Sequence, residues 1–318
     1  MKRALAIILL ALPAMAAVDG TVVNRTTGKP ATGAVVTLYQ MGQGGMSPLE
    51  TMRADGEGRF AATKDAEGPK LLQVIFDGVV YSQMLTPGTP TTGVTVDVYN
   101  TSKQPGEAKI AQHMVLLEPS DGQLAVSEAY VFNNSGKTTY NNPADGTLRF
   151  WMPDEAKGIV KVNATAPGGM PVERTAVKAA EANVYKVDFP IKPGETRIDV
   201  RYLVPFASDG TYKAKVLHNG STRLVTPGGV TLAGDNIASL GPEPQTGANI
   251  YDLKGRAIKV TVQGNGSLRA AEPEVENAGP EIQRIMPKIW DNAIPILGLA
   301  FGILALGFVL LYRAQPGA

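Results

Sequence analysis

The chain has 318 residues, of which 30 are basic and 29 acidic, and it contains no cysteine. A charge balance so close to neutral excludes the strong positive field with which proteins hold nucleic acid or an anionic surface. The lack of cysteine excludes disulfides, thiol catalysis and thiolate metal sites. The 35 glycines and 23 prolines lie among short valine-rich runs, which is typical of turns between many short strands.

The first sixteen residues have the pattern of a secretory signal peptide. Lys2 and Arg3 form a basic start, and residues 4–12 form an apolar stretch that is too short to span a membrane. Ala14 and Ala16 complete a small-residue cleavage site. Cleavage after Ala16 removes two basic residues, so the mature chain has 28 basic and 29 acidic residues and a net charge of −1.

Residues 17–105 are predicted to form a first β-sandwich. Six or seven short apolar runs alternate with turn signals, and this regular spacing is typical of a sandwich of antiparallel strands. The clearest expected strands are residues 18–23, 33–39, 59–63, 71–76, 79–85 and 94–99.

One stretch of this region carries a family resemblance. From Gly20 to Leu38 the sequence reads G-x-V, a polar turn, T-G-x-P and then G-A-x-V-x-L, and residues 54–60 (ADGEGRF) follow as a D-x-x-G-x-F turn. This pattern resembles the carboxypeptidase regulatory-like family of bacterial proteins. The resemblance implies a transthyretin-like sandwich that acts as an accessory module, some of whose structural relatives bind carbohydrate. It brings no catalytic residues, and Val79 replaces the family's usual aromatic residue after the later glycine.

Asp55 and Glu57 lie within this turn and have two interpretations. Their carboxylates are oxygen ligands of the kind that a cation prefers, but such a site needs about six ligands. The simpler interpretation is that Asp55 caps its own turn through hydrogen bonds to nearby backbone N–H groups. We therefore predict no metal and no cofactor.

Residues 106–268 are predicted to form a second, larger β-sandwich of roughly nine strands with an immunoglobulin-like layout. Alternation is clear at residues 198–204 and 212–216, and asparagine-, glycine- and proline-rich turns separate the runs. Only residues 175–183 suggest a short helix. The chain as a whole is thus predicted to be all-β, with two tandem sandwiches and one C-terminal transmembrane helix.

The end of the chain indicates a membrane anchor. Residues 269–288 are acidic and contain proline, as expected of a stalk, and residues 289–312 contain a twenty-residue apolar run from Ala293 to Tyr312. Residues 313–318 would form a cytoplasmic tail. Two other interpretations are a buried helix of a soluble core and a glycosylphosphatidylinositol signal. Gly298 and Gly302 form a G-x-x-x-G pair, which suits close helix packing.

Few residues of the chain suggest catalytic chemistry. His113 and His218 are the only histidines, no nucleophile or metal-binding motif accompanies them, and we interpret both as surface or edge residues. Four large aromatic residues of the second sandwich suit either a core or a sugar-binding platform: Tyr130, Tyr140, Trp151 and Tyr202.

These observations predict a non-enzymatic, single-pass protein of the bacterial cytoplasmic membrane. Its N-terminal region would lie outside, in the periplasm or beyond, and its C-terminus in the cytoplasm. The sandwiches would bind another envelope protein or organise a membrane complex, with no role for nucleic acid. A carbohydrate-binding module is the first alternative, and a hydrolase that uses His113 or His218 is the second.

Overall fold

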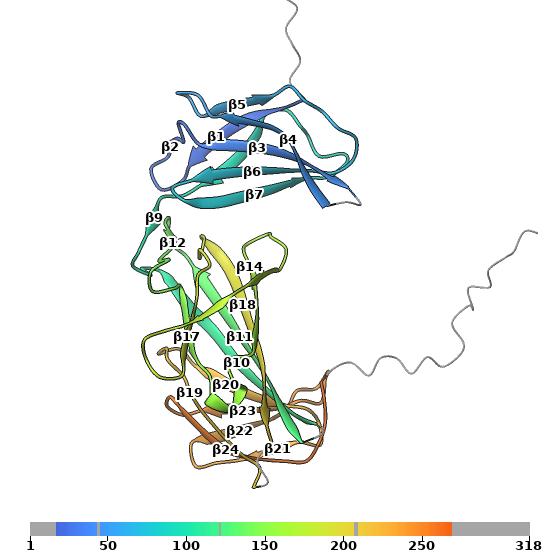
Figure 1. Ribbon diagram of the computed structural model, residues 1–318, viewed down its shortest axis with the longest axis vertical. Helices are drawn as coiled ribbons and strands as arrows, with labels where there is room; N and C mark the ends of the chain where they lie inside the picture. The colour runs from blue at the N-terminus through green and yellow to red at the C-terminus, as the bar shows by residue number, and fades with distance from the viewer. Residues whose placement is uncertain (1–16, 43–44, 121, 207–208, 269–318) are drawn as a thin grey trace, which may run out of the picture. The chain divides into compact units, whose positions relative to one another are not determined.

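The computed structural model describes residues 17–42, 45–120, 122–206 and 209–268, and this part of the chain is all-β, as predicted (Figure 1). Besides its strands it has one 3-10 turn, η1 (Asp154–Ala156). None of the helical structure in these ranges is long and apolar enough to cross a membrane. The predicted signal peptide, stalk, transmembrane span and tail lie outside the described residues, and so do Gly298 and Gly302.

The first β-region begins with a four-stranded sheet in which β1 is central. The strands are β1 (Val18–Asn24), β2 (Lys29–Pro30), β5 (Arg59–Ala62) and β8 (Val94–Val98), and β8 runs parallel to β1. The β1–β8 pair requires glycine at residue 20, because a Cβ there would lie 1.9 Å from the carbonyl oxygen of Val94. Close packing of β1 against β8 therefore explains why the first residue of the family-like pattern is a glycine.

A second four-stranded sheet completes this region. Its order is β4 (Gly45–Arg53), β3 (Val35–Gly42), β6 (Lys70–Phe76), β7 (Val79–Leu85), and all neighbouring strands are antiparallel. Val22 from the first sheet and Leu38 and Leu72 from the second are fully buried members of one hydrophobic core. The alternating apolar residues of both sheets thus face each other, which is the arrangement of a sandwich.

The second β-region is built on an eight-stranded sheet. Its order is β15 (Val172–Arg174), β14 (Val160–Thr165), β18 (Gly194–Pro205), β11 (Gln123–Asn134), β10 (Ala108–Ser120), β20 (Thr222–Thr226), β23 (Asn249–Leu253) and β22 (Ile237–Pro242). The three long strands at its centre present alternate residues to a single core.

Two three-stranded sheets also contribute to this core. One has the order β13 (Leu148–Trp151), β17 (Val184–Val187), β16 (Ala176–Lys178), and the other has the order β19 (Thr211–Lys215), β24 (Ala257–Gln263), β21 (Thr231–Ala233). The prediction of a short helix at residues 175–183 is wrong. Residues 176–178 pair with β17 instead, and Asn183 adopts a positive φ of 62° just before that strand.

A bulge in β10 decides which of its side chains reach the core. Ile110 pairs with Phe132, whereas Gln112 pairs with Val131, so Ala111 is an extra residue in the ladder. A bulge of this kind shifts the alternation by one residue. Ile110 and His113 therefore face the same side although they are three residues apart.

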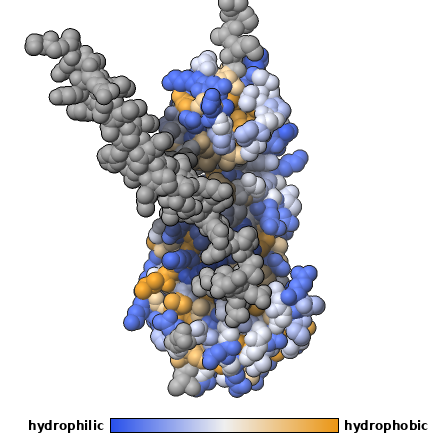
Figure 2. All heavy atoms as spheres, turned by 90° about the vertical axis from the view of Figure 1, so that its right-hand side faces the viewer, coloured by the Kyte–Doolittle hydropathy of each residue, from blue (hydrophilic) through white to orange (hydrophobic). Residues whose placement is uncertain are grey.

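Short contacts join the two β-regions. The two-residue strands β9 (Thr101–Ser102) and β12 (Thr139–Tyr140) pair in parallel. The hydroxyl of Tyr81 lies 2.9 Å from that of Thr139, and Lys192 Nζ donates to the carbonyl of Val80. On the face shown in Figure 2, apolar side chains occur in small groups among hydrophilic ones, as on most protein surfaces.

Candidate functional site

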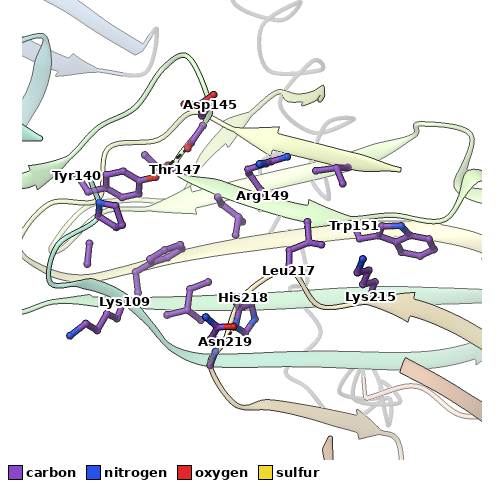
Figure 3. A pocket seen from close by; sticks show the side chains of 18 of the residues that line it. Lys109, Tyr140, Asp145, Thr147, Arg149, Trp151, Lys215, Leu217, His218 and Asn219 are labelled. Carbon is purple, nitrogen blue, oxygen red and sulfur yellow. Dashed lines mark hydrogen bonds between the residues drawn. The ribbon is translucent and has the colours of Figure 1, made fainter. Parts of the chain in front are cut away.

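A groove of about 960 Å³ opens in the second β-region (Figure 3). One wall is β13 with the turn before it, the opposite side is the start of β10, and residues 217–220 of the loop after β19 close the third side. Trp151 and Lys215 lie toward one end of the groove in Figure 3, and Tyr140 lies toward the other. Its volume is in the range of about 300–1,000 Å³ that is usual for ligand sites.

The groove meets edges of strands rather than faces of sheets. Leu148 and Arg149 of β13 line it consecutively, as do residues 108–110 of β10. Since neighbouring side chains of a strand point to opposite faces, a run of consecutive lining residues means that the strand edge is in contact with the groove. Among the strands that the structure describes, β13 pairs only with β17, and β10 pairs with β20 only from His113 to Leu116.

Charged side chains surround the apolar floor. The five charged lining residues are Lys109, Asp145, Arg149, Glu181 and Lys215, which together carry one net positive charge. Arg149 and Glu181 form an ion pair of 2.6 Å, and this hydrogen bond lowers the pKa of Glu181. Lys109 is 3.2 Å from Glu107. Within the described ranges, Lys215 alone of the three cations has no ion-pair partner.

A buried polar network lies behind the groove, centred on Glu128 of β11. The Glu128 side chain is only 6% exposed and accepts hydrogen bonds from the hydroxyls of Tyr130 and Tyr202. Tyr202 is also 2.9 Å from the hydroxyl of Tyr212, and His113 Nε2 is 3.2 Å from Glu128 Oε2. The carboxylate is therefore held by three donors, which is what its burial requires.

His218 connects this network to the groove. Its Nδ1 accepts the backbone N–H of Gly220 at 3.0 Å, which places the proton of the neutral ring on Nε2. That Nε2 is 2.9 Å from Nδ1 of His113, which therefore accepts, while Nε2 of His113 donates to Glu128. Thr222 Oγ1 also lies 3.1 Å from His113 Nδ1. The hydrogen bonds thus run in one direction from the loop to the buried carboxylate.

Burial fixes the protonation of the groups around the carboxylate. It lowers the pKa of His218 to about 4, and the neighbouring His113 lowers it as well, so this ring is neutral at pH 7. Burial and then the charge of Glu128 raise the pKa of Tyr130 and Tyr202 well above the usual value. Both phenols therefore stay protonated and act as hydrogen-bond donors.

The four aromatic candidates divide into two pairs. Trp151 and Tyr140 line the groove and are partly exposed. Tyr130 and Tyr202 are 3% and 4% exposed and belong to the Glu128 network. The interpretation of these two residues as part of a surface platform is therefore wrong. The alternating burial of their strands points both side chains into the core.

The interpretation of His113 as a surface or edge residue is also wrong. Its side chain is 2% exposed and stacks on Tyr130 with ring centroids 4.1 Å apart. The bulge at Ala111 gives the physical reason, because it brings residue 113 onto the buried face of β10. Glu128 was missed, although a signal existed: it occupies an inward position between Val126 and Tyr130 in an alternating apolar run.

Asp55 caps its own turn, as the simpler interpretation predicts. Its Oδ1 accepts the backbone N–H groups of Glu57 and Arg59 at 2.9 and 2.8 Å, and its Oδ2 pairs with the Arg59 side chain at 3.1 Å. These hydrogen bonds lower the pKa of Asp55. No group of three or more metal-ligating side chains is found within the described ranges.

The groove offers hydrogen bonds and apolar contact, and its hydroxyl and imidazole groups are already engaged. Both nitrogens of His218 are bonded to protein groups, and the Thr147 hydroxyl donates to the carbonyl of Phe189 at 2.6 Å. The Tyr140 hydroxyl donates to Gly146 at 3.4 Å. This arrangement suits the binding of a ligand better than the activation of a nucleophile.

The chain matches no protein family model, and no curated protein matches it at a significant level. The resemblance of residues 20–60 to the carboxypeptidase regulatory-like family therefore stays a prediction.

Proposed function

We propose that this chain is a non-enzymatic envelope protein that binds a protein partner in the groove of its second β-region. The observation that carries the proposal is the groove itself: an opening of about 960 Å³ whose walls are strand edges and whose floor is apolar. Protein-binding sites combine an apolar centre with a polar rim in this way. The signal-like residues 1–16 and the apolar run 293–312 support secretion and a single membrane anchor.

The fold of each region fits this role. Two four-stranded sheets around one core, with Gly20 at a close backbone approach, support a transthyretin-like sandwich of the carboxypeptidase regulatory-like type. The larger second region, which we propose to be immunoglobulin-like, would hold the binding site. Binding residues are often carried by loops that a rigid scaffold of this kind positions.

Photo-crosslinking tests the binding role. A photoreactive amino acid at Asn219, which lines the groove, is compared with one at Asp235, which is exposed and is not part of the groove lining. The full chain is expressed in bacterial envelopes and irradiated there. We expect a defined protein adduct at Asn219 and none at Asp235; equal labelling at both positions, or none at either, would refute the proposal.

A carbohydrate ligand is the second candidate, favoured by the partly exposed Trp151 and Tyr140 in the groove lining. A glycan array with the purified full chain tests it, with Trp151→Ala as the matched variant. Saccharide binding that is lost in this variant would replace the protein partner as the ligand. A hydrolase would instead require turnover that His218→Ala abolishes, although both nitrogens of this ring are already bonded.

A further inference from the structure

We infer that the groove takes an extended polypeptide segment of the partner as an added β-strand on the free edge of β13. This inference rests on the proposed function and specifies how the partner binds. β13 is an edge strand of its sheet, and among the described residues no strand pairs with its second edge. A free edge carries unpaired N–H and C=O groups, which are a template for a further strand.

The register of β13 shows which of its backbone groups are free. Met152 N–H donates to the carbonyl of Asn183 at 2.9 Å, so residues 152 and 183 form a hydrogen-bonded pair. Hydrogen-bonded pairs alternate along an antiparallel ladder, and Phe150 and Leu148 are therefore the next residues bonded to β17. The N–H and C=O groups of Arg149 and Trp151 point to the other edge.

That edge belongs to the groove. Arg149 and Trp151 both line it, and Figure 3 shows them along the same strand on one side of the opening. The side chains of Ile110 and Leu217 on the opposite side are partly buried and apolar. A strand placed beside β13 would bond to its backbone and turn every second side chain toward this apolar floor.

Charge selects among extended peptides. Lys109 and Arg149 have carboxylate partners, whereas Lys215 has none among the described residues. Lys215 lies toward the Trp151 end of the groove in Figure 3. The occupant that fits is therefore an extended segment with alternating apolar residues and an acidic side chain near this end, since rim charges mainly set partner choice.

N-methylated peptides test strand addition directly. The probe is a synthetic peptide of about eight residues, with alternating valine and threonine and one glutamate. It is compared in two N-methylated forms, one methylated at the even-numbered residues and the other at the odd-numbered residues. Alternate N–H groups of a strand point to opposite edges. Calorimetry with the purified full chain should show that one form binds at least about tenfold more weakly than the other.

Two variants locate the contact. Arg149→Pro removes the N–H that faces the groove, and an edge strand tolerates proline at such a position. Arg149→Ala loses the same ion pair but keeps the N–H, so only the proline variant should lose peptide binding by about tenfold or more. Lys215→Glu should reverse the preference, favouring a peptide with lysine in place of glutamate.

The inference is overturned if the even and odd N-methylated peptides bind equally, or if no peptide binds at concentrations up to about 1 mM. It is also overturned if Arg149→Ala and Arg149→Pro lose binding to the same extent. Should Asn219 still crosslink a protein in these cases, the proposed function would stand and only strand addition would fail. If Arg149→Pro does not fold, the pair of N-methylated peptides still decides the matter.

Discussion

Nε2 of His218 lies 2.9 Å from Nδ1 of His113, although 105 residues separate the two in sequence. This hydrogen bond connects a loop that lines the groove to a carboxylate buried beneath the sheet. The order of donors and acceptors follows from the Gly220 N–H, which occupies Nδ1 of His218. The ring of His218 must be neutral for this order of donors and acceptors to hold.

We expect His218 to titrate with a pKa of about 4 rather than at the usual histidine value of about 6.5. Burial lowers the pKa, so the unfolded chain binds the proton more tightly than the folded protein. The contribution of His218 to the free energy of unfolding is therefore fully present above about pH 6.5, and it is lost as the pH falls toward 4. Histidine NMR of the protein measures the pKa, because the chain has only two histidines to assign.

The control for this pH dependence is His218→Asn, in which the titrating ring is absent. The free energy of unfolding of this variant should change less between pH 6.5 and 4 than that of the unsubstituted protein, since all other groups are shared. A pKa for His218 near 6.5, or the same pH slope in both proteins, would contradict the hydrogen-bond chain.

Glu128→Ala should destabilise the protein by about 3–5 kcal/mol, because it removes the acceptor of three buried donors. Urea unfolding of the purified chain measures this. Glu128→Gln should cost less, since it keeps the shape and one acceptor oxygen. The matched control is Glu195→Ala at an exposed position of β18, where we expect a change within about 0.5 kcal/mol. A similar loss at both positions would show that the network adds no stability.

Alternation predicted much of the fold, and its exceptions are local. The strands around Val36, Val74 and Val200 follow directly from a period of two, because each presents every second residue to a core. His113 was misplaced because a single extra residue at Ala111 reverses the alternation, and no sequence pattern marks that bulge.

The site was less predictable than the fold, since the groove depends on which strand edges remain unpaired. Trp151 was a candidate from its size alone, but nothing local shows that β13 has a single neighbour among the described strands. Likewise, His218 meets His113 only because β20 runs parallel to β10 and the loop before β20 returns to that strand. Such contacts come from strand order, which single-sequence patterns do not determine.

Gly20→Ala tests whether the first glycine of the family-like pattern is needed for the close packing of β1 against β8. A Cβ at residue 20 would lie 1.9 Å from the carbonyl of Val94, so β1 and β8 would have to separate. We expect a loss of at least about 1–3 kcal/mol in the free energy of unfolding. Gly56→Ala is the control, because no atom lies within 4 Å of its Cβ position and its φ is not in the left-handed region. Equal stability of the two variants would contradict the close approach.

Tyr81 makes a hydrogen-bond contact between the two β-regions. The Tyr81 hydroxyl is 2.9 Å from that of Thr139, which is fully buried, and it also donates to the carbonyl of Tyr99 at 3.0 Å. Tyr81→Phe leaves both groups without this partner, so we expect a loss of about 1–3 kcal/mol and faster amide hydrogen exchange at Thr139 and Tyr140.

Tyr39→Phe is the matched control for this substitution. The Tyr39 side chain is partly exposed on β3 and makes no hydrogen bond to a described residue through its hydroxyl, so its loss should change stability by less than about 0.5 kcal/mol. Hydrogen exchange at Thr139 should stay slow in this variant. If Tyr81→Phe left exchange at Thr139 unchanged while lowering stability, the hydroxyl would serve the first core alone, and the two β-regions would be joined by β9 and β12 instead.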